Sequence, residues 1–360
     1  MQQPYDIGIG VLIFNPEDDT EHLERIEKCI SSIVAASNNT DAKTLIMLLM
    51  NMSVIGKPQV DGVGPLTKSL VKSYAEKAND KVILKERESP HSMIVNHYAH
   101  LQNELHDAVC NKVVVFADDY IVPAKWIDTV INEFEEFPTA DFITPSTNFV
   151  AQKHLLVPIE IKPQWNTVTH DNNVKGVSSG ISQKDVEDLA QKCSGHRTIK
   201  YMPQGSFETT VFTKEFLNKY GYVDNRYFSI LYNTEYFINA VLGGAKGYIS
   251  RKSYVFHYGK GGTAAVEKET RDEKHAGSPV EKYLLEDIKL FNKNTGSSRK
   301  KWWSDKPAIS EFLDNDKIEM IIKIDDYRDG CNKKFGKWKL SFYKRYLLLT
   351  RFLSFKSFNK

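Results

Sequence analysis

Short, almost uninterrupted runs of aliphatic and β-branched residues alternate along the first third of the chain with segments of helical periodicity. The uninterrupted runs cover residues 7–14, 44–50 and 113–116, and residues 81–84 predict a further short strand. Such runs are typical of strands that are buried on both faces of a parallel sheet. Between them, apolar residues recur every three or four positions, for example at Leu23, Ile26, Ile30, Ile33 and Val34, which predicts helices. The pattern therefore predicts an α/β fold with a doubly wound, mostly parallel sheet.

The second third of the chain is less regular. Apolar spacing predicts a helix from Trp126 to Phe134 and a strand over residues 142–145, whereas residues 146–200 are polar and weakly periodic. A connection of that length is usually functional, so we expect an insertion that helps to bind a second substrate. Order returns with predicted strands over 205–212, 248–249 and 253–256, and with predicted helices over 214–220 and 234–242 that end at glycines.

Composition narrows the class of protein. The 360 residues are 41% hydrophobic and 26% charged with a net charge of +2, which fits a soluble globular protein and gives no sign of nucleic-acid binding. The N-terminus lacks a basic region followed by an apolar core, and no apolar stretch reaches the length of a membrane span. The four cysteines, Cys29, Cys110, Cys193 and Cys331, are scattered and form no C-x-x-C pair. They predict free thiols in a reducing compartment, so we expect a cytoplasmic protein.

Two adjacent carboxylates, Asp118 and Asp119, follow the strand that begins at Val113. Ligands of open α/β sheets bind outside the carboxyl ends of the strands. Two negative charges at that edge are costly unless a cation or hydrogen-bond donors meet them, and a divalent metal with a phosphate ligand would do so. The alternative is an ordinary polar turn after a strand.

The C-terminal part of the chain differs in composition. Beyond residue 263 the sequence is charged and helical, and residues 331–360 carry nine Lys and Arg residues, no acidic residue and many aromatic residues. A basic segment of this kind lies readily on an anionic membrane surface. The alternative is a terminal helix packed on the body of the protein with its basic face in solvent.

Several short motifs occur in a fixed order along residues 5–263. They are the turn of Asn51 and Ser53 after the second strand, Asn96 near the start of a helix, the Asp118–Asp119 turn, Pro123 and Trp126 after it, the segment 221–228, and the segment 255–262 with His257 and Lys260. In this order they resemble a nucleotide-sugar glycosyltransferase of the GT-A fold, and most of all glycosyltransferase family 2.

The resemblance implies a GT-A domain over residues 1–263, with a donor half of about 1–123 and an acceptor half of about 124–263, followed by a helical extension over 264–360 that is basic from about 331. It also implies that Asn51, Ser53 and Asn96 bind the nucleotide, that Asp118 contacts the ribose or sugar, that Asp119 and His257 bind Mn or Mg, and that Lys260 folds over the diphosphate.

The chain departs from the family pattern at three positions. Met50 and Ala117 stand where the family has aspartates, and Asn233 stands at the usual position of the catalytic Asp. Asn cannot act as a general base. The nearest acidic residue in the motif is Glu235, which is therefore the first candidate for this role, and Asp224 is the second.

The resemblance therefore implies a metal-dependent inverting glycosyltransferase. It would move a sugar from a nucleotide-diphosphate donor to a hydroxyl of a growing surface polysaccharide, such as lipopolysaccharide or capsule, or of a glycolipid. The basic C-terminal segment would hold it at the inner face of the membrane. A catalytically inactive homologue that binds nucleotide sugar or glycan as a scaffold is the alternative. A nucleotidyltransferase with a similar sheet is a third alternative. The chain lacks a Gly-rich, Arg/Lys-containing loop after the strand at Ile7, which argues against it.

Overall fold

The computed structural model describes residues 4–54, 61–78, 81–89, 94–148, 181–195, 199–201, 207–228, 232–259, 286–287, 289–291 and 293–294. The predictions for Lys260, for Cys331 and for the basic segment 331–360 lie outside these residues. Cys29, Cys110 and Cys193 are buried free thiols, as predicted. Among the described helices, none is both long enough and apolar enough to cross a membrane.

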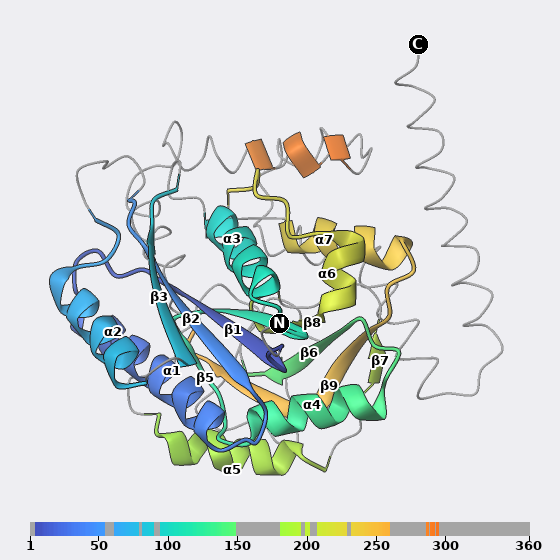
Figure 1. Ribbon diagram of the computed structural model, residues 1–360, viewed down its shortest axis with the longest axis horizontal. Coiled ribbons are helices and arrows are strands. Elements are labelled where there is room, and N and C mark those ends of the chain that lie inside the picture. Colours follow the sequence, from blue (N-terminus) through green and yellow to red (C-terminus); the bar gives the residue numbers. More distant parts are fainter. Residues whose placement is uncertain are drawn as a thin grey trace, which may run out of the picture.

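Four parallel strands form the first half of one sheet (Figure 1). They are β1 (Ile7–Ile13), β2 (Thr44–Asn51), β3 (Val82–Arg87) and β4 (Lys112–Ala117), in the spatial order β3-β2-β1-β4. Every residue of β1 and β2 is buried, which explains why both strands appear in the sequence as unbroken apolar runs. Because the four strands are parallel, their carboxyl ends lie along one edge of the sheet.

The second half of the sheet is mixed. It consists of β8 (Val211–Thr213), β6 (Phe142–Thr147), β9 (Gly247–His257) and β5 (Tyr120–Ile121), with β7 (Ile199–Tyr201) also paired to β9. β8 runs antiparallel to both β4 and β6, and β5 runs antiparallel to β9, whereas β6 and β9 are parallel. The predicted α/β fold is confirmed, and the antiparallel strands are an addition to it.

Helices cover both faces of the sheet (Figure 1). α1 (Thr20–Asn38), α2 (Pro65–Lys77) and α4 (Trp126–Glu136) pack on one face, and α3 (Ile94–Asp107), α6 (Lys214–Tyr220) and α7 (Tyr232–Leu242) pack on the other. The apolar side chains of β2 alternate between the two cores, as the period of a strand requires. Gly8 and Gly10 let α3 approach β1 closely, because a Cβ on either would lie within 3.1 Å of side-chain atoms of Leu105 and Cys110 or of Leu101.

Three local predictions were wrong. The segment 205–212 was expected to be a strand, but within its described residues, 207–212, Phe207–Thr209 is a short 3-10 helix and the strand β8 begins at Val211. The two short strands expected over 248–256 are one strand, β9, whose pairing with β6 shifts register between Thr144 and Ser146. The segment 146–200 contains the helix α5 (Gln183–Cys193), which packs on β5 and β9.

The loop after β1 supplies a cap for α2. The N-cap residue of α2, Gly64, makes no side-chain hydrogen bond. The Asp18 carboxylate accepts hydrogen bonds instead from the backbone N–H groups of Leu66 at 2.8 Å and Thr67 at 2.9 Å, and from the Thr67 hydroxyl at 2.7 Å. Burial opposes the charge of Asp18, but these three donors outweigh it and lower its pKa. The loops after β1 and β2 are thereby joined at the edge of the sheet.

We expect Asp18→Ala to lower the free energy of unfolding by about 1–2 kcal/mol, the usual cost of losing a helix cap. Asp18 has a φ of +50°, a conformation that Asn tolerates and Ala does not. Asp18→Asn is therefore the matched control, since it keeps one of the two acceptor oxygens and the backbone preference, and should cost less. Urea unfolding of the three proteins measures both differences, and equal stability of Asp18→Ala and wild type would contradict the cap.

Candidate functional site

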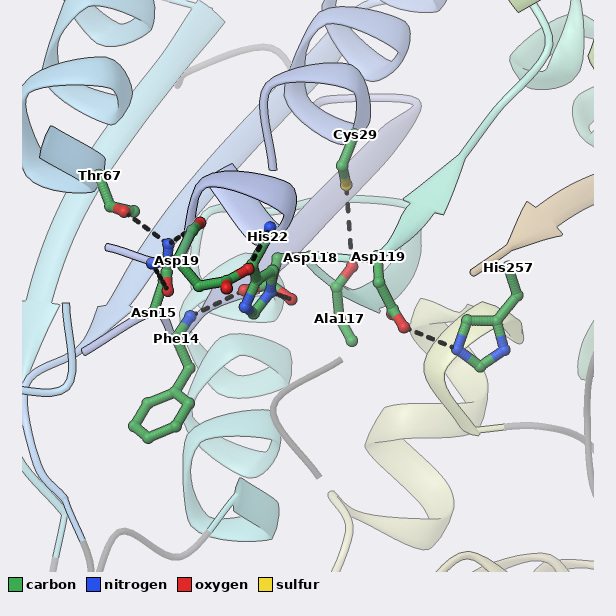
Figure 2. Close-up of polar contacts among 10 residues, drawn as sticks. All are labelled: Phe14, Asn15, Asp19, His22, Cys29, Thr67, Ala117, Asp118, Asp119 and His257. Atoms are coloured by element: carbon green, nitrogen blue, oxygen red, sulfur yellow. Dashed lines mark hydrogen bonds and ion pairs between the residues drawn. The ribbon is translucent and has the colours of Figure 1, made fainter. Parts of the chain in front are cut away.

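The two predicted carboxylates form the turn between β4 and β5, at the carboxyl edge of the parallel strands. Asp118 and Asp119 are 2% and 1% exposed. Figure 2 shows that their side chains point in different directions, Asp118 toward the end of β1 and α1, and Asp119 toward β9. The two residues therefore make contacts with different parts of the fold, although they are adjacent in the sequence.

Asp118 is bonded within the protein through both oxygens. The backbone N–H of Phe14 donates to Oδ2 at 2.8 Å, and Nε2 of His22 lies 3.1 Å from Oδ1 (Figure 2). Burial alone would lower the pKa of His22, but the charge of Asp118 and the hydrogen bond to it outweigh burial and raise that pKa. Asp118 thus joins the ends of β1, β4 and α1, and its contact with a sugar donor remains a prediction.

Asp119 meets His257 across the antiparallel pair of β5 and β9. Its Oδ2 lies 3.2 Å from Nε2 of His257 (Figure 2), and its carbonyl accepts a hydrogen bond from the backbone N–H of Tyr258 at 3.0 Å. Tyr120 pairs with His257 in the register of the two strands. The structure therefore brings together the two side chains that the sequence analysis assigned to a metal.

This pair has the chemistry of a partial metal site. An imidazole nitrogen and a carboxylate oxygen are ligands that Mn accepts, and Mg takes the carboxylate with phosphate and water oxygens. Within the described residues, no three His, Cys, Asp or Glu side chains lie close enough to hold a metal ion. A cation at Asp119 and His257 would have these two ligands from the described part of the chain, and phosphate or water oxygens suit its other positions. The two residues fit a cation that arrives with a diphosphate.

The carboxylate of Glu208 is linked to the pair of Asp119 and His257 through Tyr120. The ring of Tyr120 stacks on the ring of His257 with centroids 4.1 Å apart and planes 11° apart, and its hydroxyl lies 3.5 Å from Oε2 of Glu208. Oε1 of Glu208 also accepts hydrogen bonds from the hydroxyls of Tyr98 at 3.3 Å and Tyr232 at 3.2 Å. Burial is the main cause that raises the pKa of Glu208, and the nearby charge of Asp119 raises it further while that of His257 lowers it.

The residues expected to hold the nucleotide lie at the ends of β2 and β3 and at the start of α3. Oδ1 of Asn51 accepts a hydrogen bond from the backbone N–H of Ser53 at 3.1 Å, and Oγ of Ser53 accepts one from the backbone N–H of Ser89 at 2.8 Å. Oδ1 of Asn96 is buried and has no hydrogen-bond partner within the described part of the chain. A buried amide oxygen in that position suits an N–H group of a ligand. The binding roles of Asn51, Ser53 and Asn96 remain predictions.

The two predicted catalytic acids, Asp224 and Glu235, lie near each other and both bond to Asn294. Glu235 bonds to the hydroxyl of Tyr227 and to Nδ2 of Asn294, which lies 3.0 and 3.2 Å from its two oxygens. Asp224 forms an ion pair with Arg226 at 2.5 Å. Burial raises the pKa of Glu235, and the charge of Asp224 adds to that shift. The catalytic role of Glu235 and Asp224 stays a prediction.

The sequence did not indicate that Glu208, His22 and the tyrosines Tyr98, Tyr120 and Tyr232 lie at or near the site. Glu208 stands in a segment that was predicted to be a strand, and a single carboxylate there gave no motif. Its position becomes visible only when β8 pairs with β4 and when Tyr98 of α3 and Tyr232 of α7 converge on it. His22 lies 96 residues before Asp118 in the chain, and no local pattern in the sequence records their contact.

Comparison with known proteins gives distant likenesses to solved structures. No protein-family model and no curated protein matches the chain. The solved structures it resembles include residues 1–349 of TarS from S. aureus, with a TM-score of 0.44, 12% identity, and coverage of 88% of this chain and 78% of that one. They also include the mannosyltransferase PcManGT from Pyrobaculum calidifontis, solved with GDP-Man and Mn2+, with a TM-score of 0.43, 14% identity, and coverage of 98% and 88%. At these TM-scores and identities the likenesses carry no argument about this chain, whose α/β architecture rests on its own strand order.

Proposed function

We propose that this protein is a metal-dependent glycosyltransferase that uses a nucleotide-diphosphate sugar. The observation that carries the proposal is the pairing of Asp119 with His257, 3.2 Å apart, at the carboxyl edge of the parallel strands. Ligands of open α/β sheets bind at that edge. A buried carboxylate and an imidazole at such a place suit a cation that binds a diphosphate.

In this proposal Asp119 and His257 hold a divalent cation, Mn or Mg. The cation, when bound, neutralises the charge that gathers on the departing diphosphate. Tyr120 keeps the His257 ring in place through the stacked contact, and the backbone N–H of Tyr258 holds the carbonyl of Asp119. Asn51, Ser53 and Asn96 bind the nucleotide, and Lys260 contacts the diphosphate. The reaction is an inverting displacement, in which the acceptor oxygen attacks the anomeric carbon opposite the leaving group.

The acceptor in this proposal is a hydroxyl of a growing surface polysaccharide or of a glycolipid. Residues 1–123 bind the sugar donor, and residues 124–263 bind the acceptor. Residues 331–360, which are basic and rich in aromatic residues, make a peripheral contact with an anionic membrane. The support for the membrane contact is the composition of that segment.

A specific observation favours a second candidate. Asn233 stands at the position where the resemblance expects the catalytic Asp, and Glu235 is bonded to Tyr227 and Asn294. A non-catalytic protein that binds nucleotide sugar or glycan as a scaffold would tolerate both features. Such a protein binds its ligand without turning it over.

The experiment that separates the two candidates uses the full chain and a panel of UDP-, dTDP- and GDP-sugars. The account predicts that one of these donors is hydrolysed, or transferred to an added glycan, in the presence of Mn2+. We expect the addition of EDTA to lower the release of nucleotide diphosphate at least 100-fold, and excess Mn2+ to restore it. Binding of a nucleotide sugar without turnover across the panel would favour the scaffold, and turnover that EDTA leaves unchanged would contradict the metal.

A further inference from the structure

Glu208 lies at the end of β4 because of the way β8 pairs with that strand. β8 runs antiparallel to β4, with Lys112 opposite Thr213 and Val113 opposite Phe212. The residues that precede β8 therefore lie beside the last residues of β4, and the 3-10 helix Phe207–Thr209 contacts that strand. This topology carries Glu208 to the turn that holds Asp118 and Asp119.

Three tyrosine hydroxyls from three separate elements fix the carboxylate. Tyr98 belongs to α3, Tyr120 to β5 and Tyr232 to the first turn of α7, and each hydroxyl lies 3.2–3.5 Å from an oxygen of Glu208. Tyr120 also stacks on His257, so one side chain contacts both the carboxylate and the proposed metal ligand. The rings of Tyr98 and Tyr232 pack on Phe207, with centroids 5.5 Å away in each case. Such a frame holds the carboxylate in one orientation.

The described structure does not make Glu208 a third metal ligand. No group of three His, Cys, Asp or Glu side chains within the described residues lies close enough for that. Glu208 is nonetheless one side chain away from His257, because the hydroxyl of Tyr120 lies 3.5 Å from its Oε2 and the ring of Tyr120 stacks on the imidazole. Its side chain is only partly buried. A carboxylate that is next to the metal ligands without being one of them is suitably placed to act on an acceptor.

We propose that Glu208 is the general base of this site, an inference that rests on the proposed transferase function. In the reaction, the hydroxyl oxygen of the acceptor forms a bond to the anomeric carbon of the sugar, and its proton passes to the Glu208 carboxylate. The bond between the anomeric carbon and the diphosphate oxygen breaks, and its electron pair leaves with the diphosphate. Glu208 then supplies the proton acceptor that Asn233 cannot provide.

The test compares Glu208→Gln with a matched control, Glu133→Gln, in the full chain. Glu133 is a glutamate whose oxygen likewise accepts a hydrogen bond from a hydroxyl, that of Ser250 at 2.6 Å, but it is fully buried and belongs to α4, which carries none of the proposed site residues. Two readouts are measured: release of nucleotide diphosphate from the UDP-, dTDP- and GDP-sugar panel, with water or a glycan as acceptor, and the Mn2+-dependent binding of UDP and GDP by calorimetry.

We expect Glu208→Gln to lower turnover at least 100-fold, the usual contribution of a general base, and to leave the Kd of the nucleotide diphosphate within about threefold. Glu133→Gln should change neither by more than about threefold. The inference is overturned if Glu208→Gln keeps at least a third of wild-type turnover, if it loses nucleotide binding together with turnover, or if Glu235→Gln alone abolishes turnover. A wild-type chain that binds no nucleotide and turns over no donor would instead overturn the proposed function itself.

Discussion

Asp119→Asn should lower turnover of a nucleotide sugar by about 100- to 1000-fold, the size of effect seen when one group that stabilises transition-state charge is removed. The variant keeps the size of the side chain and loses the negative charge that faces Nε2 of His257. Asn is a poorer ligand for Mn or Mg than a carboxylate, so the cation and the diphosphate it neutralises should bind less well. Steady-state release of nucleotide diphosphate in the presence of Mn2+ measures this effect.

A matched control separates loss of the site from loss of the fold. Asp107→Asn changes an exposed aspartate at the end of α3, where it accepts a hydrogen bond from Asn103, and should keep wild-type turnover. The melting temperature of each variant shows whether it folds. Asp119→Asn with a wild-type melting temperature and wild-type turnover would remove the metal from the account.

The free energy of unfolding of the His97→Gln variant should fall less than that of wild type when the pH is lowered. His97 is 0% exposed, and its Nδ1 lies 3.4 Å from Nη1 of Arg87. Burial above all, and then the charges of Arg87 and His100, lower the pKa of His97 from its ordinary 6.5 to about 3. Between these two values the unfolded chain binds a proton that the folded chain does not, so stability falls as the pH falls through this window.

The size of this effect follows from the shift. Between pH 7 and pH 4, the folded protein should lose about 3 kcal/mol of stability through His97 alone, because each unit of pKa difference corresponds to about 1.4 kcal/mol. Urea unfolding of wild type and His97→Gln at both pH values measures it. The variant should lose about 3 kcal/mol less than wild type over that interval, whatever its stability at pH 7. An equal loss in the two proteins would show that His97 is not held neutral.

Much of the first half of the fold could be predicted because each parallel strand is buried on both faces. β1, β2 and β4 appear in the sequence as continuous apolar runs. The meeting of Asp119 and His257 could be predicted only from the order of motifs along the chain. No periodic pattern in the chain indicates that β5, which has two residues, pairs with β9.

The elements that were missed carried weak local signals. α5 has only three buried apolar positions, Val186, Leu189 and Cys193, on an otherwise charged helix, although Ser182 and Asp185 form a capping box that marks its start. Glu187 of that helix accepts a hydrogen bond from the backbone N–H of Ala124 at 2.6 Å, so α5 supports the segment that follows the two carboxylates. A capping box with so short an apolar stripe is easily read as a polar loop.

The role proposed for Glu208 could not be predicted either, and the reason differs from that for α5. Its surroundings are made by tertiary contacts from α3, β5 and α7, and no spacing in the sequence records that these three elements converge. Glu235, in contrast, was predicted from its place in a motif, and the structure surrounds it with Tyr227, Asn239 and Asn294. A motif gives the position of a residue in the chain, whereas the neighbours of a carboxylate decide what it can act on.

The most direct measurement is anomalous diffraction from crystals of the full chain grown with Mn2+ and a nucleotide diphosphate. The account predicts one manganese peak within coordination distance of both Oδ2 of Asp119 and Nε2 of His257, with oxygens of the diphosphate completing its shell. A nucleotide bound at the same edge of the sheet with no manganese at these two side chains, or with the metal held elsewhere, would contradict it.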